Sequence, residues 1–432
     1  MKKVLATILA LVMALGVTAT AWATEGGTEG GAVAEMGGTN YDDLHTALEA
    51  AKNGGTVKLL RDVELTDTWT PVGDSSTPFK GTFDGDGHKI TGLKINTGSY
   101  IGLFGYVGEG ATIKNVNLVG ANVFGVKRVG ALIGQIKGNA TVSNCTVDST
   151  SHVAGSDSNT GGLIGEAAGG ITVKLEKLIN YATVMNTENN GPSRAAGIIA
   201  QVTSGANVTI TNCVNNGAIT TNTGYAGGIV AAKQGSSKVS FENCSNAGTL
   251  TGNYKGSLIA WLVGGNWLSM TNSGDARTAI GAVNISRNEG YTFYFTIDGE
   301  EYYIRKQGGA EGSDTKFSAL WDGKKTIDRA YMKRIIDFFD YAKSEQGEGG
   351  SFAAYPSNRA ELFGHAWNTS NHTRMDSMFG AEGWPELLSR YNEAKHDDMK
   401  TDDFKVIWEA NILYSAPAPA PTPDPTPSTG GY

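Results

Sequence analysis

Seven carboxylate side chains lie between residues 100 and 250, in the most regular part of the chain. They are Glu109, Asp148, Asp157, Glu166, Glu176, Glu188 and Glu242. Enzymes that cleave polysaccharides need two or more carboxylates close together, often with Ca²⁺ between them. Only Glu176 and Glu242 occupy the same position in the repeat described below, and two repeats separate them. The sequence therefore predicts no catalytic residue in this region.

Candidate metal ligands and nucleophiles are equally sparse. The stretch from Asp84 to Gly87 is similar to the start of a calcium-binding loop but lacks the downstream bidentate Glu, so we interpret it as a turn. His365 and His372 occur without the His-Glu-x-x-His pattern of zinc peptidases. No Gly-x-Ser-x-Gly nucleophile motif and no phosphate-binding loop occurs. We predict neither a metal site nor a cofactor.

The three cysteines, Cys145, Cys213 and Cys244, each follow an Asn at the same place in the repeat. Zinc needs more ligands at closer spacing, so a metal role is disfavoured. We expect an inward-facing ladder of free thiols, because buried Cys behaves as a small apolar residue. A disulfide between Cys213 and Cys244 is the alternative, since stacked coils bring these residues within bridging distance.

Three tryptophans are the candidate binding residues: Trp321, Trp367 and Trp384. They lie in the aromatic-rich region from residue 289 to residue 415. Exposed aromatic rings can stack on sugars or anchor a protein partner, although burial in a core is the alternative. The expected partner is a glycan or a surface or matrix protein.

An internal repeat organises the chain from about residue 79 to residue 275. Its signature is a tetrad of a small residue, two large apolar residues and a second small residue. The closing small residues are Gly105, Gly134, Gly165, Ala200, Ala231 and Ala260. A second marker, an Asn at a turn, keeps the same spacing at positions 115, 144, 212, 243 and 272, with one repeat degenerate around residues 175–180. Two markers with one spacing of roughly 30 residues indicate stacked structural repeats.

The composition between the markers predicts β-structure. Short β-branched runs such as Val208-Thr209-Ile210 are bounded by Gly, Asn and Ser, which favour turns. One coil cannot bury its own apolar face, so coils must stack about 4.8 Å apart. We predict a right-handed parallel β-helix over residues 40–288, with about three strands in each coil. The marker Asn should adopt left-handed backbone angles and hydrogen-bond the equivalent Asn of the next coil.

The stretch from Phe83 to Leu93, followed by Tyr100 to Gly105, resembles the opening of a GLUG-repeat region. Such regions occur in bacterial surface adhesins and in the non-catalytic part of IgA-cleaving metallopeptidases. The resemblance covers less than half of the chain. It implies a surface location and leaves the function open.

The N-terminus has the pattern of an export signal. Residues 1–23 contain Lys2-Lys3, an apolar run and a small-x-small cleavage site ending at Ala23. We expect residues 24–39 to form a flexible leader. Residues 40–51 should form an amphipathic helix that caps the first coil, because uncovered strand edges invite aggregation. No other segment is long and apolar enough to span a membrane.

The C-terminal part differs in composition from the repeats. Residues 291–306 predict a β-hairpin with Asp298-Gly299 as its turn. The rest of the region to residue 415 predicts a smaller, mostly helical α+β domain, with helices at 326–344 and near residues 358, 385 and 404. Residues 416–432 contain alternating Pro and read as an extended linker. Attachment to the cell wall would require a continuation beyond Tyr432.

The net charge of −8 without long charged runs argues against nucleic acid and anionic membranes as partners. We therefore expect a secreted or cell-surface attached protein with a structural or adhesive role. Its β-helical stem would present a binding module. The alternative is a β-helical polysaccharide lyase or glycoside hydrolase with a site formed by loops.

Overall fold

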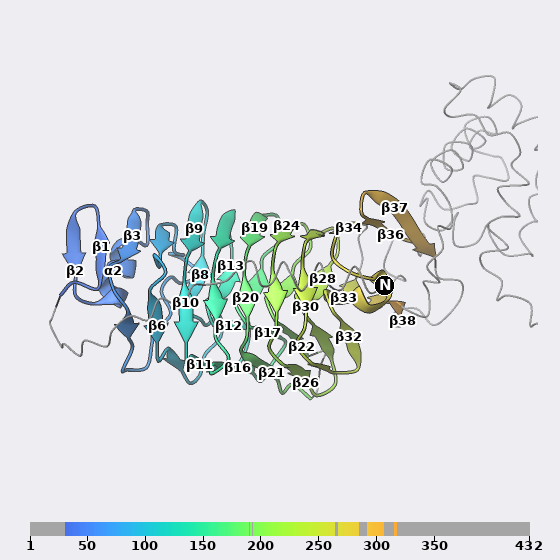
Figure 1. Ribbon diagram of the computed structural model, residues 1–432, viewed down its shortest axis with the longest axis horizontal. Helices are drawn as coiled ribbons and strands as arrows, with labels where there is room; N and C mark the ends of the chain where they lie inside the picture. Colours follow the sequence, from blue (N-terminus) through green and yellow to red (C-terminus); the bar gives the residue numbers. More distant parts are fainter. Residues whose placement is uncertain are drawn as a thin grey trace, which may run out of the picture.

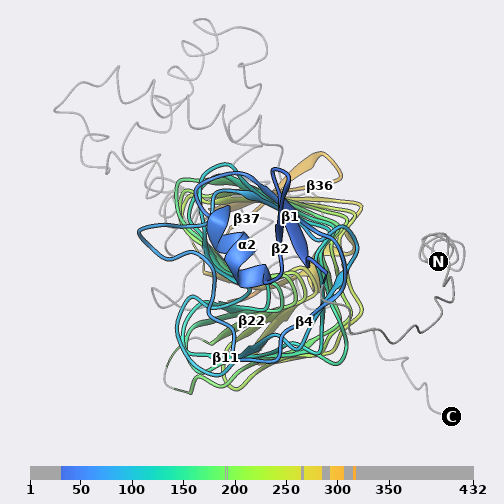
Figure 2. The ribbon, with the colours of Figure 1, turned by 90° about the vertical axis from the view of Figure 1, so that its left-hand side faces the viewer.

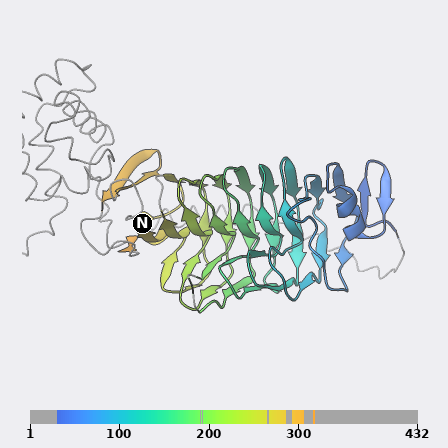
Figure 3. The same ribbon diagram turned by 180° about the vertical axis from the view of Figure 1, so that it is seen from behind.

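The part of the chain that the structure describes winds into a stack of coils. The computed structural model describes residues 31–189, 191, 193–263, 267–284, 292–305 and 315–317. Figures 1 and 3 show the coils following one another along the long axis of a rod. Strands of successive coils pair in parallel and form five sheets. The predicted parallel β-helix is confirmed.

Three sheets contain the strands that open each coil. The first sheet has the order β2 (Thr39–Tyr41), β1 (Ala34–Met36), β3 (Thr56–Leu59), β5 (Thr82–Asp84), β9 (Ala111–Lys114), β14 (Ala140–Ser143), β19 (Thr172–Glu176), β24 (Asn207–Thr211), β29 (Lys238–Glu242), β34 (Trp267–Thr271), β36 (Thr292–Ile297) and β37 (Glu300–Arg305). The second has the order β30 (Ser245–Asn246), β25 (Val214–Asn215), β20 (Ile179–Asn180), β15 (Thr146–Val147), β10 (Asn117–Val119), β6 (Lys89–Thr91) and β4 (Val63–Glu64). The third has the order β31 (Leu250–Thr251), β26 (Ile219–Thr221), β21 (Thr183–Asn186), β16 (His152–Gly155), β11 (Asn122–Gly125) and β7 (Lys94–Ile95).

Two further sheets complete the coil. The fourth has the order β12 (Val129–Gly130), β17 (Asn159–Gly161), β22 (Arg194–Ala196), β27 (Tyr225–Gly227) and β32 (Tyr254–Gly256). The fifth has the order β38 (Thr315–Lys316), β35 (Ile280–Asn284), β33 (Ile259–Val263), β28 (Val230–Gln234), β23 (Ile199–Val202), β18 (Ile164–Ala167), β13 (Ile133–Ile136) and β8 (Phe104–Val107). The described helices are α2 (Leu44–Ala50) and α3 (Ala276–Ala279).

Each coil from β9 to β33 visits the five sheets in the same sequence, so the expected three strands per coil were wrong. The strands within these coils are only two to five residues long. Turn residues interrupt them more often than the β-branched runs suggested. Gly120, between β10 and β11, has a φ of 62°, and Asn115, between β9 and β10, has a φ of 56°. The coil is therefore bent at more corners than a triangular cross-section needs.

The tetrads lie in register at the corner between the fourth and fifth sheets. Ile164 pairs with Ile133 on one side and with Ile199 on the other. The amides of Ile198 and Ile199 both donate to the carbonyl of Ile229, at 3.2 Å and 2.9 Å. Two donors on one acceptor are the mark of a β-bulge, which turns two consecutive side chains to the same side. This explains why the tetrad holds two adjacent apolar residues, since Ile198 and Ile199 are both buried.

The marker asparagines adopt the predicted left-handed backbone angles, and two of the predicted hydrogen bonds between coils are present. They have positive φ angles of 56°, 52°, 54°, 51° and 45° at Asn115, Asn144, Asn212, Asn243 and Asn272. Asn144 donates to Asn115 and Asn272 donates to Asn243, each over 2.7 Å between Nδ2 and Oδ1. The degenerate repeat places Lys177 at this position, also with a positive φ of 52°.

A second ladder of asparagines runs through the interior, and the sequence analysis missed it. Asn180 donates to Asn215 over 2.8 Å, and Asn215 donates to Asn246 over 2.6 Å. A Cβ added to Gly197 of the tetrad would lie 2.4 Å from Asn215. The second sheet therefore touches the corner between the fourth and fifth sheets. This contact separates the main core from a smaller cluster formed by Val184, Ala195, Ile219 and Ala226.

The N-terminal segment corrects one expectation. Residues 31–39 belong to the fold, whereas residues 24–39 were expected to be a flexible leader. Strand β1 pairs antiparallel with β2 and with β3, and Ala34 is fully buried. The reason is that the open edge of β3 offers unpaired backbone groups, which β1 satisfies.

The expected helix is present as α2, which begins after Asp43. The Asp43 carboxylate accepts a hydrogen bond from the Thr46 amide over 2.7 Å, as an N-cap does. Leu44, Ala47 and Leu48 are buried, as the helical pattern predicted. Figure 2 looks at this end and shows α2 and the β1–β2 pair in front of the coils. That α2 protects the stack as a cap stays a prediction.

The predicted hairpin is formed by β36 and β37, with Asp298 and Gly299 at positive φ angles of 50° and 83°. Strand β36 also pairs in parallel with β34, so the first sheet continues past the boundary expected at residue 288. The helices expected after residue 317 lie outside the described residues.

Candidate functional site

Two rows of side chains face each other between the fourth and fifth sheets, and we call them together the polar seam. The row of the fifth sheet contains Tyr106, Gln135, Glu166, Gln201, Ala232 and Trp261. The row beside and along the fourth sheet contains Tyr100, Arg128, Asn159, Arg194, Tyr225 and Tyr254. Except for Ala232, every member carries a planar polar or aromatic group. The strand pairing spaces the members of each row about 4.8 Å apart.

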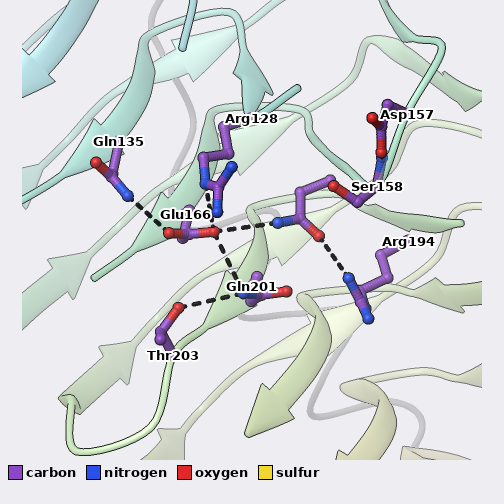
Figure 4. A network of polar contacts seen from close by, with 9 residues as sticks. Arg128, Gln135, Asp157, Ser158, Glu166, Arg194, Gln201 and Thr203 are labelled. Atoms are coloured by element: carbon purple, nitrogen blue, oxygen red, sulfur yellow. Dashed lines mark hydrogen bonds and ion pairs between the residues drawn. The ribbon is translucent and has the colours of Figure 1, made fainter. Parts of the chain in front are cut away.

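Glu166 lies at the centre of the polar seam and is only 3% exposed. Its carboxylate accepts hydrogen bonds from Arg128 Nε at 2.7 Å and from Gln135 Nε2 at 2.7 Å. Asn159 Nδ2 and Gln201 Nε2 donate to it at 3.2 Å each. Figure 4 shows these donors converging on Glu166 from both rows. Such a buried carboxylate requires this number of partners, because an unpaired charge would be costly.

Arg194 is the second buried charge of the polar seam, with 8% of its surface exposed. Its Nη1 donates to Asn159 Oδ1 over 3.1 Å, and its guanidinium lies 4.9 Å from the Trp261 ring centroid. Burial lowers the pKa of the Arg194 guanidinium. Its Nε and the Oε1 of Gln201 are buried and have no hydrogen-bond partner. Figure 4 shows the Gln201 oxygen pointing away from Glu166, to the side on which Arg194 lies.

Aromatic rings occupy both ends of the polar seam. Tyr100 stacks on Tyr106 with 4.8 Å between centroids, and Arg128 lies 4.8 Å from the Tyr100 centroid. At the other end, Tyr225 stacks on Trp261 at 4.4 Å and on Tyr254 at 5.2 Å. Stacked rings beside guanidinium groups are a favourable arrangement for both.

The polar seam carries an excess of positive charge. Arg128 and Arg194 face the single carboxylate of Glu166. The adjacent Asp157 forms an ion pair with Lys127 at 3.3 Å, so the two charges cancel and the net charge of the polar seam is unchanged. Glycoside hydrolysis generally needs two carboxyl groups, one of which donates a proton to the leaving oxygen. Both oxygens of Glu166 already accept hydrogen bonds from the protein, so the geometry favours binding over acid–base chemistry.

Asp84 and Glu109, two of the other acids considered in the sequence, have structural partners. Asp84 accepts from Asp86 N at 2.9 Å and from Asn115 Nδ2 at 2.8 Å, which makes the stretch a turn as interpreted. Glu109 accepts from the Asn139 amide over 2.9 Å. Among the residues that the structure describes, no group of three or more His, Cys, Asp or Glu side chains could hold a metal ion.

The three cysteines are buried free thiols, as the sequence analysis favoured over a disulfide. Burial raises the pKa of the Cys145 thiol to about 12. Burial also raises the pKa of the Cys213 thiol. The thiols of Cys145 and Cys213 are therefore inert packing groups.

The nominated Trp321, Trp367 and Trp384 lie outside the described residues. Sequence reasoning named Glu166 only as an isolated acid and missed its partners. A signal for them exists, because each tetrad is flanked by one member of each row. Arg128 and Gln135 flank the second tetrad, and Arg194 and Gln201 flank the fourth.

No protein-family model matches the chain, so membership of the GLUG-repeat proteins stays a prediction. A protein of Evansella cellulosilytica described as "Putative Gly-rich membrane protein" is 36% identical over 102 residues, which are 21% of this chain and 12% of that protein. Halomucin of Haloquadratum walsbyi is 32% identical over 134 residues, which are 31% of this chain and 1% of halomucin. The chain thus spans a small part of either relative. One of these two relatives is described as a membrane protein.

A solved structure gives a further likeness. It is described as a "putative immunoglobulin A1 protease" from Bacteroides ovatus, with a TM-score of 0.43 and 21% identity. The match covers 61% of this chain and 75% of that one. In the described part of this chain, neither helix has the length and apolar character to cross a membrane.

Proposed function

We propose that the chain is an exported, cell-surface structural and adhesion protein whose β-helix serves as a rigid stem. The observation that supports this proposal most directly is the unbroken register of the coils. Every tetrad from Phe104 to Ile259 pairs with the next one without a slip. A stack of paired strands with a continuous core resists bending, which suits a spacer. The relatives named above are compatible with a surface location.

The stem would hold the region after residue 317 away from the surface, and this region would bind a glycan or a surface or matrix protein. Trp321, Trp367 and Trp384 are the nominated contact residues. The purified full chain should bind a subset of a glycan and matrix-protein array. Substitution of these three by Ala should remove the signal, while Trp408→Ala in the same region should keep it. Absence of any binding by the full chain would contradict the adhesive role.

A duplicated coil tests the stem separately. Residues 111–139 can be repeated between Asn139 and Ala140, because Ala111 and Ala140 are register partners. The longer chain should fold, extend the rod by about 4.8 Å in small-angle X-ray scattering, and keep its array binding. Loss of binding on lengthening would show that the coils are not a passive stem.

Protease treatment of intact producing cells should digest the chain if it is surface-exposed.

A further inference from the structure

The polar seam contains polar groups that the protein itself leaves unmatched. Arg194 Nε and Gln201 Oε1 are buried without a hydrogen-bond partner. Arg194 and Gln201 are 8% and 6% exposed, so these atoms have left bulk water. A buried donor or acceptor without a partner destabilises the protein, because it has lost its hydrogen bonds to water. A ligand that supplies the missing partners would offset this loss.

The net positive charge of the site favours the binding of an anion. Arg128 donates directly to Glu166, whereas the described hydrogen bond of Arg194 goes to the neutral amide oxygen of Asn159. Arg194 is therefore a buried guanidinium without a carboxylate of its own. A guanidinium binds carboxylates through two adjacent N–H groups, and Nε is one of the groups used in such contacts.

The side chains around Arg194 favour a sugar as the molecule that bears this carboxylate. Tyr225, Tyr254 and Trp261 form a stacked aromatic group next to the guanidinium. Tyr254 and Trp261 are partly exposed, so the polar seam reaches solvent at this level. Gln201 adds an amide acceptor for a hydroxyl group. Aromatic rings can pack against the apolar faces of a pyranose ring, while neighbouring amide and guanidinium groups hydrogen-bond its hydroxyl groups.

We propose that the polar seam at Arg194 binds an acidic sugar, such as a uronic acid unit of a glycan. The sugar carboxylate contacts Arg194, a ring hydroxyl donates to Gln201 Oε1, and the ring packs at Tyr254 and Trp261. This site lies in the stem and is independent of the region that carries Trp321, Trp367 and Trp384.

The wild-type chain provides the first test. Titration calorimetry compares methyl glucuronide with methyl glucoside and with acetate, which separate the contributions of carboxylate and ring. Methyl glucuronide should bind at least tenfold more tightly than either control, and its affinity should fall with added salt. Equal binding of acetate and glucuronide, or no binding of glucuronide, would overturn the proposal.

Variants then locate the site. Arg194→Gln should weaken glucuronide binding at least tenfold. Arg194→Lys should have an intermediate affinity, because Lys keeps the positive charge but lacks the adjacent N–H donors of the guanidinium. The control Lys127→Gln changes an exposed cation of the same surface and should bind as the wild type does. Unchanged affinity in Arg194→Gln would place the ligand elsewhere and refute the assignment. If circular dichroism shows that Arg194→Gln is unfolded, Tyr254→Ala decides, since it should weaken glucuronide binding and leave acetate unaffected.

Discussion

Asn144 donates its side-chain amide to Oδ1 of Asn115, one coil earlier, across 2.7 Å. Both residues have left-handed backbone angles, which Asn tolerates better than other residues with a Cβ. The same relationship joins Asn272 to Asn243. One turn position thus combines a backbone requirement with a hydrogen bond between coils.

The interrupted ladder gives the first prediction. Lys177 has a φ of 52° at the marker position and cannot bridge the neighbouring coils as an amide does. Lys177→Asn should raise the free energy of unfolding by about 1 kcal/mol, through relief of strain and new hydrogen bonds. Chemical denaturation measures the change. Lys177→Gly relieves the strain alone and should gain less; a decrease for Lys177→Asn would show that the ladder is not stabilising.

The close contact of the tetrad with the interior gives the second prediction. A Cβ on Gly197 would lie 2.3 Å from the Gly228 carbonyl oxygen and 2.4 Å from Asn215. Gly197→Ala should therefore cost about 3 kcal/mol or more, or prevent folding, because backbone must move. Gly110→Ala is the control, since its Cβ meets nothing within 4 Å and its φ of 79° adds only strain. Equal destabilisation of the two variants would mean that the coil has room at the tetrad.

The buried carboxylate gives the third prediction. Glu166→Gln leaves Arg128 and Arg194 without a counter-charge in the polar seam. We expect a loss of about 3–5 kcal/mol in the free energy of unfolding, as for other broken buried pairs. The double variant with Arg128→Gln should lose less than the sum of the two single changes. Additive losses in denaturation experiments would show that the two side chains do not interact.

The buried thiol gives a prediction on pH. Cys145 has a pKa of about 12 in the folded chain against 9.0 when exposed. Between these values the unfolded chain loses the thiol proton and the folded chain keeps it, so the folded state binds more protons. The free energy of unfolding must therefore fall as pH rises above the unfolded pKa, by up to about 1.4 kcal/mol per pH unit from this thiol.

Cys145→Ala tests this linkage. The variant should lose about 1 kcal/mol at neutral pH through the removed sulfur contacts, yet show a shallower decline in alkaline solution. Denaturation midpoints over roughly pH 8 to 11 measure both slopes. Parallel slopes for the two proteins would show that the Cys145 thiol titrates normally in the folded state.

The repeat spacing was sufficient to predict the stack and its register, and the Asp298-Gly299 turn between alternating residues was sufficient to predict the hairpin. These features are local, because turn residues and alternating apolar residues act within a few positions of one another. The same reasoning expected three strands per coil, which was wrong, and a flexible leader over residues 24–39, which was wrong for residues 31–39. Strand length depends on where the coil bends, and β1 is ordered because the open edge of β3 binds it.

The sequence by itself determined that equivalent residues stack, because a fixed repeat in parallel strands allows no other pairing. The tertiary structure alone decided which different rows meet across a coil. Arg128 and Glu166 are 38 positions apart and belong to different rows, yet their side chains lie 2.7 Å from each other. Their contact follows from the bend between the fourth and fifth sheets, which the bulge at the tetrad sets. The tetrad marks where the bend falls, but the residues that meet there come from successive coils, so only the packing of the whole stack decides which of them pair.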